Sequence, residues 1–351
     1  MWPLIRMAEM RLEVDPFESL GSEARFAAMG DPKLIPHGAN WISNARPPLP
    51  GAGMACCSLR LGRTILLGVF NPEEYELIDF GAGRRLERIG GIVVDRPCPA
   101  AADCARRMPE VWESADLRYE RNAGGRDEWT GRRSSPEPWI VRHKSLRFEL
   151  QTTPLGQVGL FPEQVESWNW IENQVQRAGR ALRVLNLFAY TGGSTLAAAA
   201  AGAEVVHVDA AKPMVAWAGR NAAHSDLADA GIRWIVDDAA KFVAREVRRG
   251  RRYEGLILDP PSYGHGPRGE PWKIERHLDE LLSRCAGVLA ERVAFVLLTC
   301  HTPSISPGRL RQALATSLPA GSRQAVRVRS LFLQTADGRK LPSGLAATWP
   351  E

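Results

Sequence analysis

Residues 184–194 read Val184-Leu-Asn-Leu-Phe-Ala-Tyr-Thr-Gly-Gly-Ser194, an apolar run that stops abruptly at two glycines. A run of helix-forming residues, Thr195 to Ala201, follows at once. A strand that feeds a helix through glycines brings backbone N–H groups and a helix N-terminus up to a ligand. A second apolar run ends in an acid, Asp209, which predicts a hydrogen bond to the ribose of a nucleoside-bearing cofactor.

From residue 146 onward, predicted strands and helices alternate. The strands are expected near 183–188, 204–208, 233–236, 254–258 and 293–299, and the helices near 194–202, 212–224, 238–249, 273–290 and 307–318. Repeated βαβ units predict a parallel sheet with right-handed crossovers. The tail breaks the alternation, because Val326–Leu333 and Leu345–Trp349, on either side of Asp337-Gly338, indicate an antiparallel hairpin. We therefore predict an α/β fold with a parallel sheet that finishes in this hairpin.

Three regions are expected along the chain. Residues 1–53 lack periodicity and are rich in Pro, Gly and Ala, so we expect a poorly ordered leader, and Met54 is a candidate start of the protein. Residues 54–145 carry short strand patterns separated by glycine turns, which predicts a small β-rich domain. Residues 146–351 hold the alternating units and form the third region.

Tryptophans and arginines are interleaved between residues 112 and 142. Such a pattern can stack on bases and hold phosphates, so the β-rich region is a candidate RNA-binding module. The alternative is that the tryptophans are core residues and the arginines form a solvated face. The net charge of +5 and the pI of about 9.0 suit a polyanionic partner, although a GC-rich genome would also explain the arginine excess.

Cysteine usage and hydropathy limit the class of protein. Six cysteines show no metal-type spacing and no Cys-x-x-Cys, so we expect free thiols in a reducing cytoplasm and no metal site. No apolar run approaches the ~20 residues that a membrane helix needs, so no membrane partner is expected.

The glycine turn argues against two common cofactor classes. A nicotinamide enzyme would carry Gly-x-Gly-x-x-Gly here, whereas Gly192 and Gly193 are adjacent and no third glycine follows on the helix. The Gly-Lys-Ser/Thr of a phosphate-binding loop is also absent. A nucleoside cofactor without phosphates remains, and S-adenosylmethionine fits, with Asp209 on its ribose and Asp238, or its neighbour Asp237, on its adenine. Either of these last two acids could instead cap the helix that follows.

The fourth strand ends in Asp259-Pro-Pro-Ser-Tyr263. Two prolines make a stiff loop at the carboxyl edge of the sheet, where ligands bind in open α/β folds. We expect this loop to place a polar group and Tyr263 beside a planar base. A structural turn with a surface tyrosine is the alternative.

Taken together, these motifs resemble those of class I S-adenosylmethionine-dependent methyltransferases, with their Rossmann-like sheet. Four motifs are similar to the group that contains the bacterial large-subunit ribosomal RNA cytosine-C5 methyltransferases: Leu185–Gly193, Val236–Ala239, Leu258–Gly264 and Leu298–Cys300. Thr153–Gln164 resembles the motif that precedes the catalytic domain of that group. The resemblance covers about residues 146–350 and implies S-adenosylmethionine as cofactor and ribosomal RNA as partner.

The same resemblance assigns individual residues. The cofactor contacts fall on Asn186, Phe188, Thr191, Gly192, Gly193, Asp209 and Asp238. Asp259 and Pro260 line the target-base pocket, and Cys300 is the nucleophile, whose thiolate adds to C6 of cytosine so that C5 can take the methyl group. A buried strand-end thiol is the alternative for Cys300. His301 is not assigned as the base that removes the C5 proton, because neighbours in a strand point to opposite faces.

Some features depart from the family or leave the substrate open. Ser262 stands where another branch of RNA cytosine-C5 enzymes has a second cysteine, so the proton-removing base is unassigned. Beyond it, Arg268 and Lys273 could bind phosphate and Trp272 could stack on a flipped base, or this stretch is a mobile surface loop. The leading hypothesis is a cytoplasmic ribosomal RNA C5 methyltransferase that uses Cys300. The alternatives are a nitrogen methyltransferase using Asp259 and Tyr263 on RNA or a small molecule, a non-catalytic RNA-binding protein with this fold and, least supported, an oxidoreductase.

Overall fold

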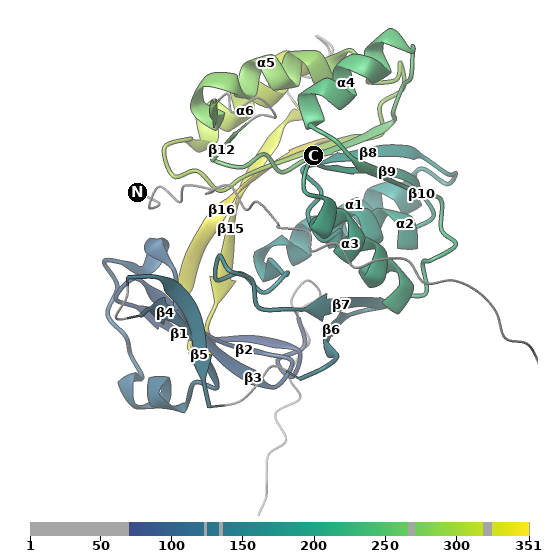
Figure 1. The fold of residues 1–351 in the computed structure, drawn as a ribbon. Coiled ribbons are helices and arrows are strands. Elements are labelled where there is room, and N and C mark those ends of the chain that lie inside the picture. The colour runs from purple at the N-terminus through teal and green to yellow at the C-terminus, as the bar shows by residue number, and fades with distance from the viewer. Residues whose placement is uncertain (1–69, 123–124, 133–135, 266–270, 319–324, 351) are drawn as a thin grey trace, which may run out of the picture. The chain divides into compact units, whose positions relative to one another are not determined.

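A computed structural model describes residues 70–122, 125–132, 136–265, 271–318 and 325–350 (Figure 1). The predicted leader, residues 1–53, and the candidate start Met54 lie outside these residues. The chain divides into two units, and all described residues belong to the second, Ile65–Glu351. Within the described residues, no helix has the length and apolar character needed to cross a membrane.

A seven-stranded sheet forms the centre of the region after residue 180. Its strands, in spatial order, are β10 (Ile232–Val236), β9 (Glu204–Asp209), β8 (Arg183–Leu187), β11 (Gly255–Leu258), β14 (Phe295–Cys300), β16 (Lys340–Trp349) and β15 (Arg327–Gln334). The first five strands are parallel, and β16 and β15 continue the sheet in antiparallel pairing. The predicted α/β fold, a Rossmann-like sheet that finishes in a C-terminal hairpin, is therefore confirmed.

Helices cover both faces of this sheet (Figure 1). One layer contains α4 (Ala239–Arg248), α5 (Ile274–Ala286) and α6 (Pro307–Ser317), and the other contains α1 (Val165–Arg177), α2 (Gly193–Ala200) and α3 (Lys212–His224). Successive strand residues face alternate layers, so that Val184 packs in the cluster with α1 and α2, whereas Leu185 packs in the cluster with α4, α5 and α6. Burial of both faces explains why the strands are continuous apolar runs in the sequence.

The strand order reverses between β8 and β11. After β8, the chain adds β9 and β10 on one side, whereas β11 and β14 lie on the other. Leu187 pairs with Leu258, so Phe188 and Asp259, which follow them, leave the sheet at the same edge. Open α/β sheets bind ligands outside the carboxyl ends of the strands at such a switch point. The glycine turn and the Asp-Pro-Pro loop therefore meet where a ligand is expected.

The region before residue 151 is rich in β-structure. A five-stranded sheet contains, in spatial order, β1 (Tyr75–Gly81), β2 (Arg84–Ile89), β3 (Ile92–Pro97), β4 (Leu117–Arg121) and β5 (Asp127–Gly131). A separate hairpin pairs β6 (Trp139–His143) with β7 (Leu146–Leu150) and lies across the predicted limit between residues 145 and 146. The β-rich N-terminal region is confirmed, while the predicted domain limits stay predictions.

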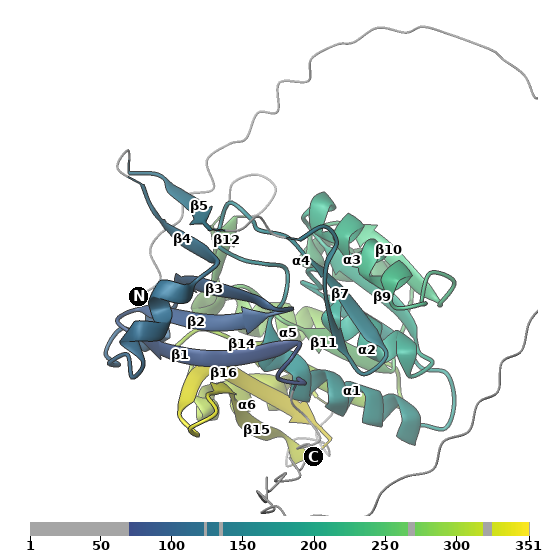
Figure 2. The ribbon, with the colours of Figure 1, turned by 90° about the horizontal axis from the view of Figure 1, so that it is seen from below.

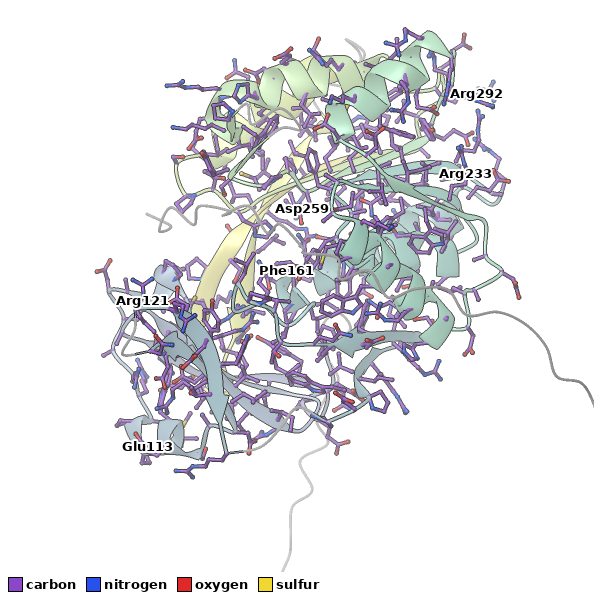
Figure 3. The ribbon with its side chains drawn as sticks, in the orientation of Figure 1. Glu113, Arg121, Phe161, Arg233, Asp259 and Arg292 are labelled. Atoms are coloured by element: carbon purple, nitrogen blue, oxygen red, sulfur yellow. The ribbon has the colours of Figure 1, made fainter. Side chains whose placement is uncertain are left out.

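Two of the interleaved tryptophans are core residues. Trp112 is 1% exposed and Trp139 is 2% exposed. Trp129 is half-buried, and its indole N–H donates to the Thr153 carbonyl at 2.7 Å. On the hairpin of β4 and β5, Arg121, labelled in Figure 3, forms an ion pair with Asp127. These tryptophans therefore serve packing first, which was the alternative to base stacking.

The C-terminal hairpin also contacts the N-terminal sheet. Thr335, just after β15, forms a β-bridge with Leu77 of β1, and Arg339 forms an ion pair with the buried Asp79 of the same strand. Figures 1 and 2 both show the end of this hairpin beside β1. The C-terminal hairpin is thus joined to the N-terminal sheet by a backbone β-bridge and an ion pair.

Candidate active site

The loop after β8 has an unusual backbone. Phe188 and Tyr190 have φ angles of 58° and 49°, and Gly192 has a φ angle of 93°. Left-handed backbone in residues with a Cβ atom costs about 1–3 kcal/mol each and concentrates at functional sites. The loop is fixed because the Tyr190 N–H donates to Asp209 Oδ2 at 2.9 Å, at the end of β9.

Both glycines of the turn permit close packing of helices. A Cβ atom at Gly193 would lie 2.5 Å from the Trp168 ring of α1, and one at Gly192 would lie 3.1 Å from Ala218 Cβ of α3. The start of α2 therefore fits tightly between its two neighbours. The first N–H groups of a helix have no partner within the helix and can bind an anionic group such as a carboxylate.

A pocket opens between the loop after β8 and Asp259. Two predicted cofactor contacts, Asn186 and Thr191, line this pocket, while their side chains form hydrogen bonds within the protein. Asn186 Nδ2 donates to Thr195 Oγ1 at 2.8 Å, and that hydroxyl lies 2.9 Å from His207 Nδ1. Thr191 Oγ1 donates to the Gly159 carbonyl at 2.7 Å. Burial lowers the pKa of His207 to about 3, so the ring is neutral. These hydrogen bonds fix the loop after β8 to the residues packed against it. The sequence did not indicate a role for His207.

Three acids lie at the carboxyl ends of two neighbouring strands: Asp209 is the last residue of β9, and Asp237 and Asp238 follow β10. The Asp209 carboxylate accepts a second backbone bond, from the Ala211 N–H at 2.9 Å, and burial raises its pKa. Asp238 accepts a hydrogen bond from the Lys241 N–H at 2.9 Å and is the N-cap of α4. Asp237 forms an ion pair with Arg245. The capping alternative therefore holds for Asp238, and its contact to adenine stays a prediction.

Replacement of Asp209 by alanine is expected to weaken the binding of S-adenosylhomocysteine. A hydrogen bond to a charged group is worth about 1.5–3 kcal/mol, so the loss should be roughly 10- to 150-fold in Kd. Calorimetric titration measures this, with Asp226→Ala as the control because the Asp226 side chain is 87% exposed. Equal affinities in the two variants would contradict a ribose contact at Asp209.

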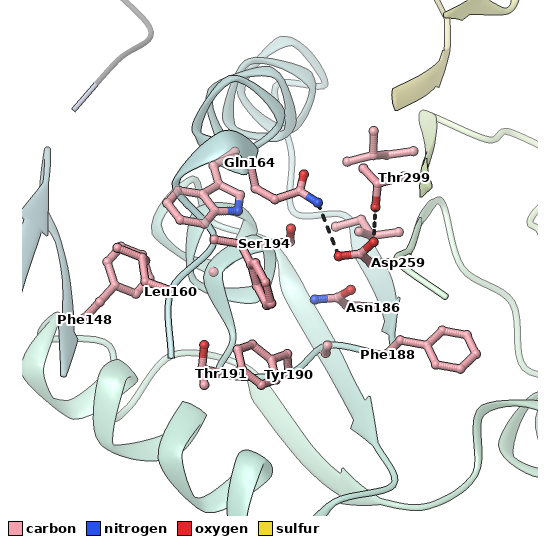
Figure 4. A pocket seen from close by; sticks show the side chains of 16 residues that line it. Phe148, Leu160, Gln164, Asn186, Phe188, Tyr190, Thr191, Ser194, Asp259 and Thr299 are labelled. Atoms are coloured by element: carbon pink, nitrogen blue, oxygen red, sulfur yellow. Dashed lines mark hydrogen bonds between the residues drawn. The ribbon is translucent and has the colours of Figure 1, made fainter. Parts of the chain in front are cut away.

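Three side chains converge on Asp259 after β11, and Figure 4 shows two of them, Gln164 and Thr299. Thr299 Oγ1 donates to Asp259 Oδ1 at 2.6 Å, and Gln164 Nε2 donates to Oδ2 at 3.2 Å. His301 Nε2 lies 3.3 Å from Oδ1. Burial alone would raise the pKa of Asp259, but the charge of His301 and these hydrogen bonds lower it, so the carboxylate is ionised.

Gln164 reaches Asp259 from the segment that precedes α1. This segment includes η3 (Pro162–Gln164), and Phe161 just before it lines the same pocket as Asp259 (Figure 3). The Gln164 Oε1 atom is buried and has no hydrogen-bond partner among the described residues. The motif that the sequence places upstream of the catalytic domain thus forms one wall of the pocket.

The other predicted substrate residues lie around the Asp-Pro-Pro loop. Pro260 is buried, Tyr263 is 39% exposed, and Lys273 is exposed at the start of α5. Arg268 lies outside the described residues. Trp272 is engaged within the protein, since its indole N–H donates to the Pro261 carbonyl at 2.7 Å. Stacking of Trp272 on a flipped base stays a prediction.

The side chain of Cys300 lies on the opposite face of β14 from the side chain of Thr299, which contacts Asp259. The Cys300 side chain is 1% exposed and packs in the apolar cluster that includes Leu278 of α5 and Leu310 of α6. Its neighbours Thr299 and His301 contact Asp259 instead, as the alternation of a strand requires. Burial raises the pKa of the Cys300 thiol. The alternation could have shown from the sequence that His301, rather than Cys300, shares a face with Thr299.

The residues around the pocket fit a positively charged nucleoside cofactor. The ionised Asp259 supplies negative charge, and Asp209 supplies a partly buried acceptor at the end of the adjacent strand. The tight glycine turn supplies backbone donors. This set of groups suits the sulfonium, ribose and carboxylate of S-adenosylmethionine.

Comparisons with known proteins agree with this fit. Residues 113–322 match the sequence profile of the S-adenosylmethionine-dependent methyltransferase family. A crystal structure of a SAM-dependent methyltransferase from Agrobacterium tumefaciens is 35% identical, with a TM-score of 0.73, over 79% of this chain and 90% of that chain. A structure described as a methyltransferase complexed with SAH has the same fold, with 17% identity and a TM-score of 0.62 over 78% of this chain and 74% of that one.

Curated relatives match over part of their length. A ribosomal RNA large subunit methyltransferase K/L from Methylococcus capsulatus is 27% identical over 234 residues, which cover 62% of this chain and 31% of that protein. A ribosomal RNA large subunit methyltransferase I from Aeromonas salmonicida is 23% identical over 249 residues, which cover 67% of this chain and 59% of that protein. The chain therefore spans less than two thirds of either relative.

Proposed function

Because the chain belongs to the S-adenosylmethionine-dependent methyltransferases, we propose that it methylates a nitrogen atom on a base of large-subunit ribosomal RNA, held beside Asp259. Membership of this family makes the chain an enzyme rather than a non-catalytic RNA-binding protein or an oxidoreductase. The RNA assignment is supported by the relatives named as ribosomal RNA large subunit methyltransferases. A net charge of +5 also suits a polyanionic substrate.

The hydrogen-bonding capacity of the pocket favours a base with an exocyclic amino group. An ionised carboxylate offers about four acceptor sites, and Asp259 uses three of them on Thr299, Gln164 and His301. The remaining site on Asp259 and the buried Gln164 Oε1 are both acceptors. They complement a group with two N–H donors, such as the exocyclic amino group of adenine, guanine or cytosine. Cytosine carries such an amino group whichever of its atoms is methylated, so these acceptors select the class of base, and the enclosed position of Cys300 is what favours transfer to nitrogen.

The proposed reaction needs little from the protein beyond positioning and charge. When bound, S-adenosylmethionine supplies a methyl group on a positively charged sulfur. Asp259 accepts a hydrogen bond from the target amino group and holds its nitrogen in line with that methyl carbon. As the nitrogen forms its new bond, the electrons of the broken carbon–sulfur bond stay on sulfur. The nitrogen becomes cationic, and its surplus proton passes through Asp259 to water.

The competing prediction is methylation of cytosine C5 through Cys300. That mechanism needs a thiolate in contact with C6 of the base. Cys300 is 1% exposed, and its burial raises the pKa of its thiol, although hydrogen bonds from Thr302 act to lower that pKa. The thiol would have to leave its packing against α5 and α6 before it could react, so this mechanism has less support than transfer to nitrogen.

Replacement of Cys300 by alanine is therefore expected to leave methyl transfer in place. The measurement is incorporation of a labelled methyl group into RNA from a strain that lacks the gene. Cys285→Ala, which alters an equally buried thiol on α5, controls for packing damage. A loss on the order of 10⁶-fold in Cys300→Ala alone, as when other covalent nucleophiles are removed, would restore the C5 mechanism.

Nucleoside mass spectrometry of ribosomal RNA from the deletion strain and its parent tests the proposal as a whole. The expected result is the loss of one N-methylated nucleoside, which returns when the wild-type gene is restored. Loss of 5-methylcytidine would contradict the choice of nitrogen, and an unchanged profile would contradict the RNA assignment.

A further inference from the structure

His301 is held from both sides of its ring. Its Nδ1 atom lies 2.6 Å from the Ser343 carbonyl of β16, and this contact requires a hydrogen on Nδ1, because a carbonyl only accepts. Its Nε2 atom lies 3.3 Å from Asp259 Oδ1 and 3.2 Å from Gln164 Nε2. The ring therefore sits between a fixed carbonyl and the carboxylate proposed to contact the substrate.

The His301 ring can occupy this position because Gly344 has no side chain. A Cβ atom at Gly344 would lie 2.8 Å from His301 Nδ1 and 2.7 Å from the Cys300 carbonyl, and its φ angle is 139°. A side chain at this point would push the ring away from Ser343. In β16, Ser343 therefore provides the hydrogen-bond acceptor for His301, and the next residue, Gly344, leaves the space for its ring.

The charges that face His301 are negative. Asp259 directly follows β11 and Glu163 lies in η3, while the Phe161 ring stacks on the His301 ring with 6.5 Å between centroids. Burial alone would lower the pKa of His301, but Asp259, with a smaller effect of Glu163, raises it to about 9. Arg85 of β2 is a cation within electrostatic range of Glu163. His301 is therefore positively charged at neutral pH.

We propose that His301 is a positioning residue for methyl transfer: its protonated ring donates from Nε2 to Asp259 and keeps that carboxylate ionised and turned toward the target amino group. This inference rests on the proposed function, because it assigns a role relative to the amino group. The Ser343 carbonyl fixes the orientation of the His301 ring, and the ring in turn fixes the orientation of the Asp259 carboxylate. Nothing in the four sequence motifs indicated it.

Loss of the proton should reverse the interaction. With Nδ1–H kept on Ser343, neutral His301 presents Nε2 as an acceptor, which can take a hydrogen bond from Gln164 but repels Asp259. Because the pKa is raised above the ordinary 6.5, the pairing contributes fully below about pH 6.5 and is lost as the pH rises through about 9. Methyl transfer should fall over the same alkaline range.

The first test reads His301 directly and needs no substrate. NMR titration of ¹³C-labelled histidine should show one ring with a pKa near 9. The His301→Gln variant identifies this signal by its absence. In Asp259→Asn the same signal should titrate about one to three pH units lower, since an opposite charge at this range raises a pKa by that much. The matched control is His224→Gln, which removes a histidine of α3 that lies 3.4 Å from the carboxylate of Glu149 in β7 and should leave the His301 signal in place. A His301 signal that is unmoved in Asp259→Asn overturns the proposal.

The second test follows kcat/KM against pH, with RNA from the deletion strain as substrate. Glutamine keeps a donor near the Nε2 position but does not titrate. His301→Gln should therefore retain measurable activity and lose the alkaline fall near pH 9, whereas His301→Ala should lose activity across the range. An alkaline fall that persists unchanged in His301→Gln overturns the positioning role. If wild-type protein transfers no methyl group to RNA, the proposed function fails while the NMR result still decides the pairing.

Discussion

Replacement of Asp259 by asparagine is expected to lower kcat/KM for methyl transfer by about 10²- to 10⁴-fold, the range over which positioned acid–base groups contribute. Asparagine keeps the shape of the side chain, but its amide nitrogen replaces one acceptor oxygen and its negative charge is gone. The site would lose both the acceptor for the target N–H and the charge that offsets the cationic nitrogen. Incorporation of labelled methyl groups into RNA measures the loss.

The matched control for this variant is Asp279→Asn on α5, whose carboxylate is 65% exposed and pairs with Arg309. Affinity for S-adenosylhomocysteine should change little in either variant, so that the defect appears in kcat. An Asp259→Asn protein with wild-type kcat/KM would exclude Asp259 from the chemistry, whichever atom of the base is methylated.

Replacement of Asp79 by alanine is expected to cause the largest loss of stability, about 3–5 kcal/mol, as when one partner of a buried ion pair is removed. Asp79 is 0% exposed and accepts hydrogen bonds from Trp112 Nε1 at 2.9 Å and from the Met108 N–H at 3.0 Å. It also pairs with Arg339 of the C-terminal hairpin. In the variant these donors, together with the Phe80 and Arg107 N–H groups, would be left without this acceptor inside the protein.

Urea denaturation followed by circular dichroism measures the effect of this change, with Asp337→Ala as the control. Asp337 also contacts Arg339, at 3.3 Å, but its side chain is 48% exposed. Burial acts to raise the pKa of Asp79, yet the bonds from Trp112 and Arg339 lower it, so its contribution is present above its ordinary pKa and is lost as the pH falls. The gap between wild type and Asp79→Ala should therefore narrow in acid, and a constant gap would contradict this account.

The main features of the fold could be predicted because they depend on local pattern. The alternation of apolar runs with helical segments fixed the parallel sheet, and the run around Asp337 fixed the final hairpin. Some element ends differ by a few residues. For example, α5 stops at Ala286 rather than near 290, and β14 starts at Phe295 rather than near 293. Such limits depend on packing with distant residues rather than on periodicity.

The candidate site was only partly accessible from the sequence, for a physical reason. Asp259 follows a strand in an open α/β sheet, and this alone places it at the ligand-binding edge. His301 is oriented toward Asp259 by a hydrogen bond from its Nδ1 atom to the carbonyl of Ser343, 42 positions later in the sequence. Gln164, which also contacts Asp259, lies 95 positions before it in the sequence. Contacts of this kind depend on strand pairing across the whole sheet, which no short motif encodes.

The assignment of Cys300 as nucleophile rests on the family resemblance and stays a prediction. A cysteine at the end of a strand matched a family pattern, while strand alternation already separated it from Thr299, which reaches Asp259. Once α5 and α6 cover that face, the thiol is enclosed in the core. The periodicity of β14 was therefore a better guide to which side chains meet than the identity of the single residue.

The hairpin of β15 and β16 carries a constraint on length. Arg339, which holds Asp79 of the N-terminal sheet, and Ser343, which holds His301, are separated by only three residues of one strand. Insertion or deletion of a single residue between them would shift the pairing register and turn the following side chains to the other face. One such change would therefore be felt both in the anchoring of the N-terminal sheet and in the orientation of Asp259. Homologues that keep both contacts should accept substitutions in this interval far more readily than changes in its length.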